Sequence, residues 1–421
     1  MNLENLTPYA ALNYIVVDQH GQEFHVIAAR GTYRLGAAPP SPPGDDGAPP
    51  VTHLATLAPG GLSFTDDYHG EMNRSSVKWE SDLAPMKPRC DVILIGAAHS
   101  PTGEPVRRVE VALRIERLHE IPAPVLAKPG VLLEHRLAVH GARSFERRGG
   151  GWALTESEPF TELPLRYEHA FGGELKVYGG EEAANRLADA HRLPEEVRRG
   201  HPEGEAAPVA HTTCVQNPVG TGFLEKWYAE AAEVERWPAP RIEAPGAGID
   251  AAVFARMVDG KVRPGEAPEL SPRGVGVIAK PWEPRLALAG TLDAQWLEKR
   301  WPLMPGDFDM AYWNGAHPDM QCAHLHGGEQ VELWNVLPKG APGALSDPSG
   351  TACRFELPDA GVVAHFTGNG AEAIGLVAVD TVIIDLEEMT LALVWRAVLP
   401  VAGGFEHASL RAYGHELPEN A

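Results

Sequence analysis

Several side chains that can bind a metal ion lie within a short stretch of this chain. Asp307 and Asp309 precede His324 and His326 in the sequence. On a β-strand the two histidines of a His-x-His pattern point to the same face, so both could bind one metal ion together with a nearby carboxylate. One hypothesis is therefore a metal-dependent hydrolase that uses these four residues.

A structural role for the same side chains is the alternative that we favour, because the sequence offers no second anchored pair of ligands. The two histidines can form hydrogen bonds with the surrounding backbone. Asp307 and Asp309 can pair with Arg285 or Arg300, or they can close a turn after Pro305. We therefore expect no catalytic residue, no bound metal and no cofactor.

Two further patterns allow both a chemical and a structural interpretation. His169, next to Glu168, could act as a general acid or base, but a histidine within the aromatic run YEHAF is more often a packed residue. Asn217, Gly220 and Gly222 could form an anion-binding nest, or a tight turn that begins at the Asn-Pro pair. In both cases we favour the structural interpretation.

The common sequence signatures of catalysis are absent. The chain contains no G-x-S-x-G, no H-E-x-x-H, no G-x-x-x-x-G-K-[ST] and no G-x-G-x-x-G. Gly274 and Gly276 begin the last of these, but Ala279 stands where its final glycine belongs. The chain therefore lacks the motifs of the commonest enzyme classes, but their absence does not exclude an enzyme of another class.

The segment from Pro272 to Glu329 is the region expected to position these residues. It contains four of the ten tryptophans of the chain, interspersed with arginines and aspartates. Large aromatic side chains gain most when they are buried, and opposite charges can pair at the edge of such a cluster. Together with the Asn-Pro turn, this segment predicts a packed structural hub rather than an exposed groove. The hub residues are Asn217, Gly220, Gly222, Trp282, Arg285, Trp296, Arg300, Asp307 and Asp309.

Short apolar runs separated by glycine and proline turns dominate the rest of the chain. From Val109 to Ile115, apolar and polar residues alternate, which is typical of a strand with one buried face. Gly21 and the pair Asn369-Gly370 each lie between two apolar runs and predict β-hairpins. We expect a mainly β fold of antiparallel sheets packed as sandwich-like lobes, with a small helical insertion.

The helical insertion divides the chain into three predicted regions. Helices are expected at Glu181–Leu193 and Glu195–Arg199, with a break at Pro194. The regions are an N-terminal β-rich lobe at 1–175, the helical insertion or linker at 176–210, and a C-terminal β-rich lobe with the hub at 211–421.

Composition and charge limit the classes of partner. The chain has 421 residues, with 57 acidic and 36 basic side chains, which gives a net charge of −21. This charge repels phosphate backbones and anionic lipids, so we expect neither nucleic acid nor membrane as a partner. The four cysteines are far apart, and neither a secretory leader nor a membrane-spanning apolar run is visible. We therefore expect a cytoplasmic protein with reduced thiols.

The series of motifs along the chain resembles a bacterial family known as domain of unknown function 2169. The resemblance extends from Tyr14 to Leu399, and it departs from the family pattern at the loop Pro238–Gly246. The His324/His326 pair is not part of that pattern, and the pattern carries no catalytic residues. In chain order the matching runs are KPRCDVILIGAAHSPTG, HGARSFERRGGGW, FTELPLRYEHAFGG, NPVGTGF, PWEPRLALAGTLDAQWLEKRWPLMPGDFDMAYWNGAHPD, GGEQVELWNVLPKG and VDTVIIDLEEMTLALVWRAVLP.

The resemblance implies a role in type VI secretion, because the family is found in gene clusters for that system. The implied function is a non-enzymatic adaptor or chaperone that binds a secreted effector and helps to load it onto the spike protein. The acidic charge suggests a basic, nuclease-like effector. Gly36–Pro50, Gly340–Gly350 and the insertion Glu181–Arg199 are the candidate contact regions. The alternatives are the metal-dependent hydrolase and a structural component of the secretion apparatus.

Overall fold

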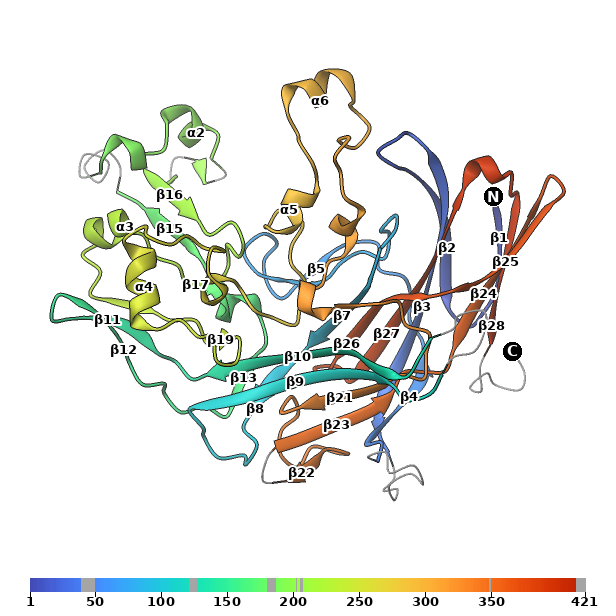
Figure 1. Ribbon diagram of the computed structural model, residues 1–421, viewed down its shortest axis with the longest axis horizontal. Helices are drawn as coiled ribbons and strands as arrows, with labels where there is room; N and C mark the ends of the chain where they lie inside the picture. The colour runs from blue at the N-terminus through green and yellow to red at the C-terminus, as the bar shows by residue number, and fades with distance from the viewer. Residues whose placement is uncertain are drawn as a thin grey trace.

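The computed structural model describes residues 1–38, 50–120, 127–179, 187–201, 203–204, 207–347 and 350–413. Strands dominate this part of the chain, helices are few and short, and most strands are antiparallel (Figure 1). The expected mainly β fold with several antiparallel sheets is therefore confirmed. None of the described helices has the length and apolar character needed to cross a membrane.

A seven-stranded sheet joins the beginning of the chain to its end. The central pairings are β3 with β27, and β26 with β7, of which the second is parallel. β4 (His53–Ala58) adds to β3 outside the main order. The order is β2 (Ala10–Val17), β3 (Glu23–Ala37), β27 (Thr390–Pro400), β26 (Val379–Asp385), β7 (Cys90–Ile95) and β20 (Gln321–Cys322).

Two further sheets complete the main body. The six-stranded sheet is antiparallel throughout, whereas the four-stranded sheet has one parallel pair, β1 with β28. The six-stranded order is β19 (Ile242–Glu243), β10 (Gly130–His140), β9 (Arg108–Arg117), β21 (Gln330–Trp334), β23 (Gly350–Glu356) and β22 (Leu345–Asp347). The four-stranded order is β1 (Asn2–Leu6), β28 (His407–Tyr413), β24 (Gly361–Gly368) and β25 (Ala371–Val377).

The remaining elements are short. The small sheets are β12 (Gly151–Leu154), β11 (Ser144–Arg148) and β18 (Arg236–Pro238); β13 (Glu162–Pro164) with β8 (Ala97–His99); β14 (Phe171–Gly172) with β17 (Thr221–Gly222); β15 (Glu174–Val177) with β16 (Ala210–Thr213); and β5 (Asp67–Tyr68) with β6 (Val77–Trp79). The α-helices are α2 (Glu195–Arg199), α3 (Lys226–Ala231), α4 (Ala251–Val258), α5 (Arg285–Leu288) and α6 (Ala294–Lys299). The 3-10 helices are η1 (Tyr167–His169), η2 (Asp189–His191), η4 (Pro268–Leu270), η5 (Met310–Trp313), η6 (Pro318–Met320) and η7 (Val401–Gly403).

Local sequence patterns explain several of these elements. β9 buries Val109, Val111, Leu113 and Ile115 on one face, as the alternation predicts. The predicted hairpins form between β2 and β3 and between β24 and β25. In the second hairpin, Asn369 and Gly370 have φ of 48° and 77°, the left-handed values that a tight two-residue turn requires.

The helical insertion agrees only in part with expectation. α2 lies at the predicted Glu195–Arg199. Residues 181–186 of the other predicted helix lie outside the described part of the chain, and 189–191 form a 3-10 turn. Of the loop Gly36–Pro50, residues 39–49 also lie outside it, and the predicted loop Gly340–Gly350 contains the short strand β22.

One large hydrophobic core extends through the main sheets, and a smaller one surrounds α4. In the smaller core Phe145 stacks on Phe254 with ring centroids 3.8 Å apart. The predicted division into 1–175, 176–210 and 211–421 stays a prediction. Strands from the first and the last of these ranges nevertheless hydrogen-bond side by side in the two largest sheets.

Two buried histidines face each other where η6 packs against β10. The rings of His135 and His317 lie 5.8 Å apart, and both side chains are buried. Burial, the neighbouring His317 and Arg273 together lower the pKa of His135 to about 4, although Asp319 acts in the opposite direction. Burial also lowers the pKa of His317. Both imidazoles are therefore neutral in the folded protein at neutral pH.

We predict that the free energy of unfolding decreases as the pH falls from about 6.5 to about 4. In this range the unfolded chain binds protons that the folded chain does not bind. The free energy of unfolding therefore falls by up to about 1.4 kcal/mol per pH unit for each such proton. His135→Gln should reduce the slope, and His191→Gln, an exposed substitution, is the control. Urea denaturation at a series of pH values measures the effect. An identical slope in wild type and His135→Gln would contradict the assignment.

Candidate functional site

A buried ion pair lies at the start of β7. Asp91 is fully buried, and its carboxylate is 2.8 Å from Nζ of Lys87. The carboxylate also accepts hydrogen bonds from the side-chain amide of Asn314 and the backbone N–H groups of Gly315 and Ala316. Burial alone would lower the pKa of Lys87, but Asp91 and Asp380 together raise it. Both members of the pair thus have hydrogen-bond partners, which the burial of opposite charges requires.

A second buried ion pair adjoins the first. Asp380 of β26 lies 2.6 Å from Nε of Arg396 on β27. Thr381 connects the two pairs, because its hydroxyl donates to Asp380 at 2.8 Å and accepts from Lys87 at 2.8 Å. Arg396 also donates to the hydroxyl of Tyr14 at 2.7 Å. We refer to Lys87, Asp91, Asp380, Thr381 and Arg396 as the buried charge network.

Tyr14 adds an uncharged member to this network. Burial, opposed in part by Arg396, raises the pKa of Tyr14 to about 12. Its hydroxyl therefore keeps its proton and donates it to the carbonyl of Ala84 at 2.7 Å. In this way the two ion pairs connect three strands of the large sheet to the loops on either side.

Arg285 is the best-connected residue of the predicted hub. It is buried, and it donates to both carboxylate oxygens of Glu80, at 2.7 and 3.2 Å. It donates further to the carbonyl of Ile278 at 2.7 Å and twice to that of Tyr312, at 2.9 and 2.8 Å. All five N–H groups of the guanidinium are thus used. The neighbouring Trp282 is also buried and contacts the ring of Tyr167 edge to face at 5.8 Å.

The predicted pairing of Asp307 and Asp309 with arginines is wrong. Asp307 is exposed and accepts hydrogen bonds from the backbone and hydroxyl of Thr291, which lower its pKa. Asp309 is also exposed and accepts from the N–H of Ala311 at the start of η5. The alternative that we also stated, turn closure after Pro305, describes the contact of Asp309 at η5, whereas Asp307 contacts Thr291, which is 16 residues away in sequence. Arg285 instead forms an ion pair with Glu80, a residue that is remote in sequence.

Two other hub residues lie on a projecting segment instead of in the core. Trp296 donates from its indole to the carbonyl of Leu303 at 2.9 Å, and its ring meets that of Trp301 edge to face. Arg300 donates to the carbonyls of Met304 and Gln19. These contacts shape the segment from 284 to 309, which carries α5 and α6 and is named here the α5–α6 arm.

Asn217 joins two sequence motifs that are 44 or more residues apart. Its side-chain amide donates to the carbonyls of Tyr167 and Phe171, at 2.8 and 2.9 Å. β14 and β17 then pair in parallel beside it. A β-carbon on Gly220 would collide with the Asn217 side chain, and Gly222 has φ of 106° against the ring of Pro240. The arrangement is a structural clamp, and its backbone packs too closely for any residue larger than glycine.

The four candidate metal ligands have separate partners. His324 forms a hydrogen bond with the carbonyl of Lys87 at 3.0 Å. His326 is half-buried beside Glu329, and burial lowers its pKa although Glu329 opposes this effect. Glu329 itself forms a buried pair with Arg117 at 2.8 Å. In the described residues no three His, Cys, Asp or Glu side chains are placed to hold a metal ion.

His169 and Glu168 do not form an acid–base pair. The carboxylate of Glu168 accepts from the backbone and the hydroxyl of Ser76, at 2.8 and 2.7 Å. Burial and Arg241 lower the pKa of the half-buried His169. Both residues thus contribute to packing between segments.

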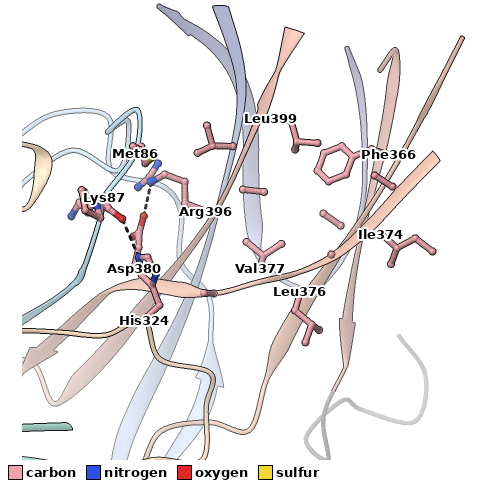
Figure 2. Close-up of a pocket in the computed structure, with 17 residues that line it drawn as sticks. Met86, Lys87, His324, Phe366, Ile374, Leu376, Val377, Asp380, Arg396 and Leu399 are labelled. Atoms are coloured by element: carbon pink, nitrogen blue, oxygen red, sulfur yellow. Dashed lines mark hydrogen bonds and ion pairs between the residues drawn. The ribbon is translucent and has the colours of Figure 1, made fainter. Parts of the chain in front are cut away.

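A groove of about 520 Å³ opens beside the buried charge network (Figure 2). Its polar end is formed by Lys87, His324, Asp380 and Arg396, and mainly apolar side chains from β24, β25 and β27 line the rest. Sequence reasoning missed the network residues. The available signal was a charged residue within an otherwise buried apolar strand, such as Arg396 in LALVWRAVL, because such a charge needs a partner.

Comparison with known proteins gives a family match. Residues 20–396 match the family described as an uncharacterized protein conserved in bacteria (DUF2169). No curated protein and no solved structure matches the chain.

We predict that Arg285→Lys destabilises the protein although it keeps the positive charge. Lysine has one ammonium nitrogen in place of the planar guanidinium, so buried acceptors on Glu80 and Tyr312 lose their donors. Each acceptor left without a donor lowers the free energy of unfolding by about 1–3 kcal/mol. Arg199→Lys replaces an exposed arginine and should change the free energy of unfolding by less than about 0.5 kcal/mol. Chemical denaturation of both variants checks this, and equal stability would refute the role of guanidinium geometry.

Proposed function

This chain belongs to the DUF2169 family of bacterial proteins, and from that premise we propose that it is a non-enzymatic adaptor or chaperone for a type VI secretion effector. In this proposal the chain binds the effector in the cytoplasm and helps to load it onto the spike protein. The secretion context comes from the resemblance of its motif series. The arrangement of its charged and apolar side chains supports a binding function.

The observation that carries the proposal is the exposed apolar surface of the α5–α6 arm. Leu292, Leu297 and Trp301 expose 55%, 61% and 65% of their surface. The arm extends away from the sheets, with α6 at its far end (Figure 1). Large apolar side chains that are grouped and exposed commonly mark a protein-binding site, and tryptophan is enriched among the residues that contribute most to binding.

The arm has the local order that a binding element needs. Asp293 caps α6 by accepting from the N–H of Trp296 at 2.7 Å. The contacts of Trp296 and Arg300 with the following turn hold the returning chain. A preformed surface loses less conformational entropy when it binds. These contacts therefore support a docking role for the arm.

The buried charges support a scaffold role. The network around Asp91 and Asp380 and the Arg285–Glu80 pair have their charges satisfied inside the protein. These charged side chains therefore bind one another and connect strands and loops. This use of charge favours a rigid binding protein over the alternative hydrolase, whose four proposed ligands have separate partners.

The chemistry of the effector follows from the net charge of −21. We propose a basic effector, such as a nuclease, because an acidic surface accelerates and strengthens its binding. Nucleic acid and membrane are not proposed as partners. The remaining alternative, a structural component of the apparatus, would make this chain a permanent part of the assembled spike.

We predict that Leu297→Ser with Trp301→Ser weakens effector binding by about 10-fold or more, because both apolar contacts are lost. The control combines Ile15→Ser with Phe64→Ser, which are comparably exposed positions outside the arm. The chain is co-expressed with each protein encoded beside its gene, a toxin among them under this proposal, and co-purification and calorimetry measure binding. Unchanged binding by the arm variant would refute docking through the arm. Failure of the wild type to bind would refute the adaptor function.

We also predict that effector binding weakens by about 5-fold or more when NaCl is raised from about 0.05 M to about 0.5 M, because salt screens attraction between exposed charges. Titration at several salt concentrations measures this. Binding that does not respond to salt would contradict a basic effector while leaving the adaptor function intact. Recovery of this chain in purified, assembled spikes would favour the structural component.

A further inference from the structure

The groove at the buried charge network lies where two paired strands separate. β26 pairs with β27 as far as Val379 opposite Trp395. Beyond this point β27 continues to Pro400 alongside β3. The residue before β26 is Ala378, which links β26 to β25 of the four-stranded sheet. The two sheets thus diverge, and the groove occupies the gap (Figure 2).

The wall on the β25 side combines three small residues with one aromatic ring. Ala364 pairs with Gly375, and Phe366 pairs with Ala373, so these four side-chain positions share the face toward the groove. Figure 2 shows the ring of Phe366 between the diverging strands and Ile374 directed away from the gap. A β-carbon added to Gly375 would meet no atom within 4 Å. Space for additional side chains is therefore open on this wall.

The opposite wall offers an unpaired strand edge. The N–H of Arg396 donates to the carbonyl of Ala378 at 3.4 Å, which places this amide on the side of β26. Backbone groups alternate along a strand, so the N–H and C=O of Val398 point to the same side. In the part of the chain that the structure describes, no strand pairs with β27 there. Among the described residues, the N–H and C=O of Val398 thus have no backbone partner, and they face the groove.

The charges at the polar end of the groove are already neutralised. Lys87 pairs with Asp91 and Arg396 pairs with Asp380, and His324 bonds to a backbone carbonyl. An incoming charge would find no free counter-charge at these groups and would lose its hydration. The electrostatic complement of this groove is therefore an uncharged ligand, although the protein as a whole is strongly acidic.

We propose that the groove receives an extended, uncharged segment of a partner polypeptide, which adds to the free edge of β27. The backbone of the segment pairs with the N–H and C=O of Val398, and its small or branched side chains fill the space beside Phe366 and Gly375. Strand addition to an open edge is a general mode of peptide recognition. This site is distinct from the α5–α6 arm. That the partner is the effector rests on the proposed function.

A random dodecapeptide library, displayed on phage and selected on the purified full chain, tests the site without knowledge of the partner. Gly375→Leu fills the groove, and Gly61→Leu is the matched control, because both glycines are exposed, lack a positive φ and have no atom within 4 Å of an added β-carbon. We expect uncharged peptides rich in β-branched residues that bind wild type and Gly61→Leu equally. Their affinity for Gly375→Leu should fall by about 10-fold or more, as for a blocked site. No enrichment, charged sequences or equal binding to Gly375→Leu would overturn the proposal.

Hydrogen exchange of the wild-type protein provides a second readout that needs no variant. Addition of a selected peptide should slow exchange of the Val398 amide by about 10-fold or more if a new backbone hydrogen bond forms there. An unchanged rate at Val398 in the presence of bound peptide would exclude strand addition. Slow exchange in the free protein that disappears after truncation at Tyr413 would identify the chain's own C-terminal segment as the occupant. A dimer abolished by Gly375→Leu would identify a second copy, and either result overturns the proposal.

Co-purification with the toxin found among the proteins encoded beside the gene separates the two proposals. Toxin retained by Gly61→Leu but lost by Gly375→Leu, and displaced by the selected peptide, supports both. Toxin retained equally by all variants leaves the adaptor function standing and overturns the groove as its site. Absence of toxin from the wild type refutes the adaptor function, while the peptide selection still decides the groove.

Discussion

The pairing of buried charges across the large sheet is the interaction on which the rest of this structure depends. Asp91, Asp380 and Arg396 lie in neighbouring strands, and Lys87 and Thr381 connect them. A buried charge without a partner costs several kcal/mol, so these strands are stable side by side only if the partners are in place. The network therefore specifies which distant segments meet, in addition to holding them together.

The same network determines the electrostatic character of the groove. Its residues Lys87, Asp380 and Arg396 line one end of the groove, at the place where β26 leaves β27 and the two sheets diverge. Because its charges are satisfied internally, the groove is neutral within an acidic protein. The α5–α6 arm differs from the groove because it lies outside the core. It presents exposed apolar side chains on a short segment that is held by hydrogen bonds within the arm. The protein thus offers two kinds of surface, one concave and one projecting.

Glycine has a specific role at the contacts between motifs. At Gly220 and Gly222 the backbones approach so closely that a side chain would collide with Asn217 or Pro240. At Gly375 the absence of a side chain leaves open space instead. The same residue type therefore locks one pair of segments and keeps a groove open elsewhere. These opposite consequences follow from the tertiary surroundings and not from the local sequence.

The sequence by itself determined the local elements. Alternation fixed the buried face of β9, and turn residues fixed the hairpins at Gly21 and Asn369-Gly370, because these structures depend on neighbours along the chain. Only the tertiary structure decided the partners of the charges. Arg285 pairs with Glu80 instead of the nearby Asp307 or Asp309, since many carboxylates along a chain are chemically equivalent until the sheets bring one of them within reach. The groove was likewise invisible in sequence, because it arises where two sheets diverge, and that depends on the packing of strands far apart in the chain.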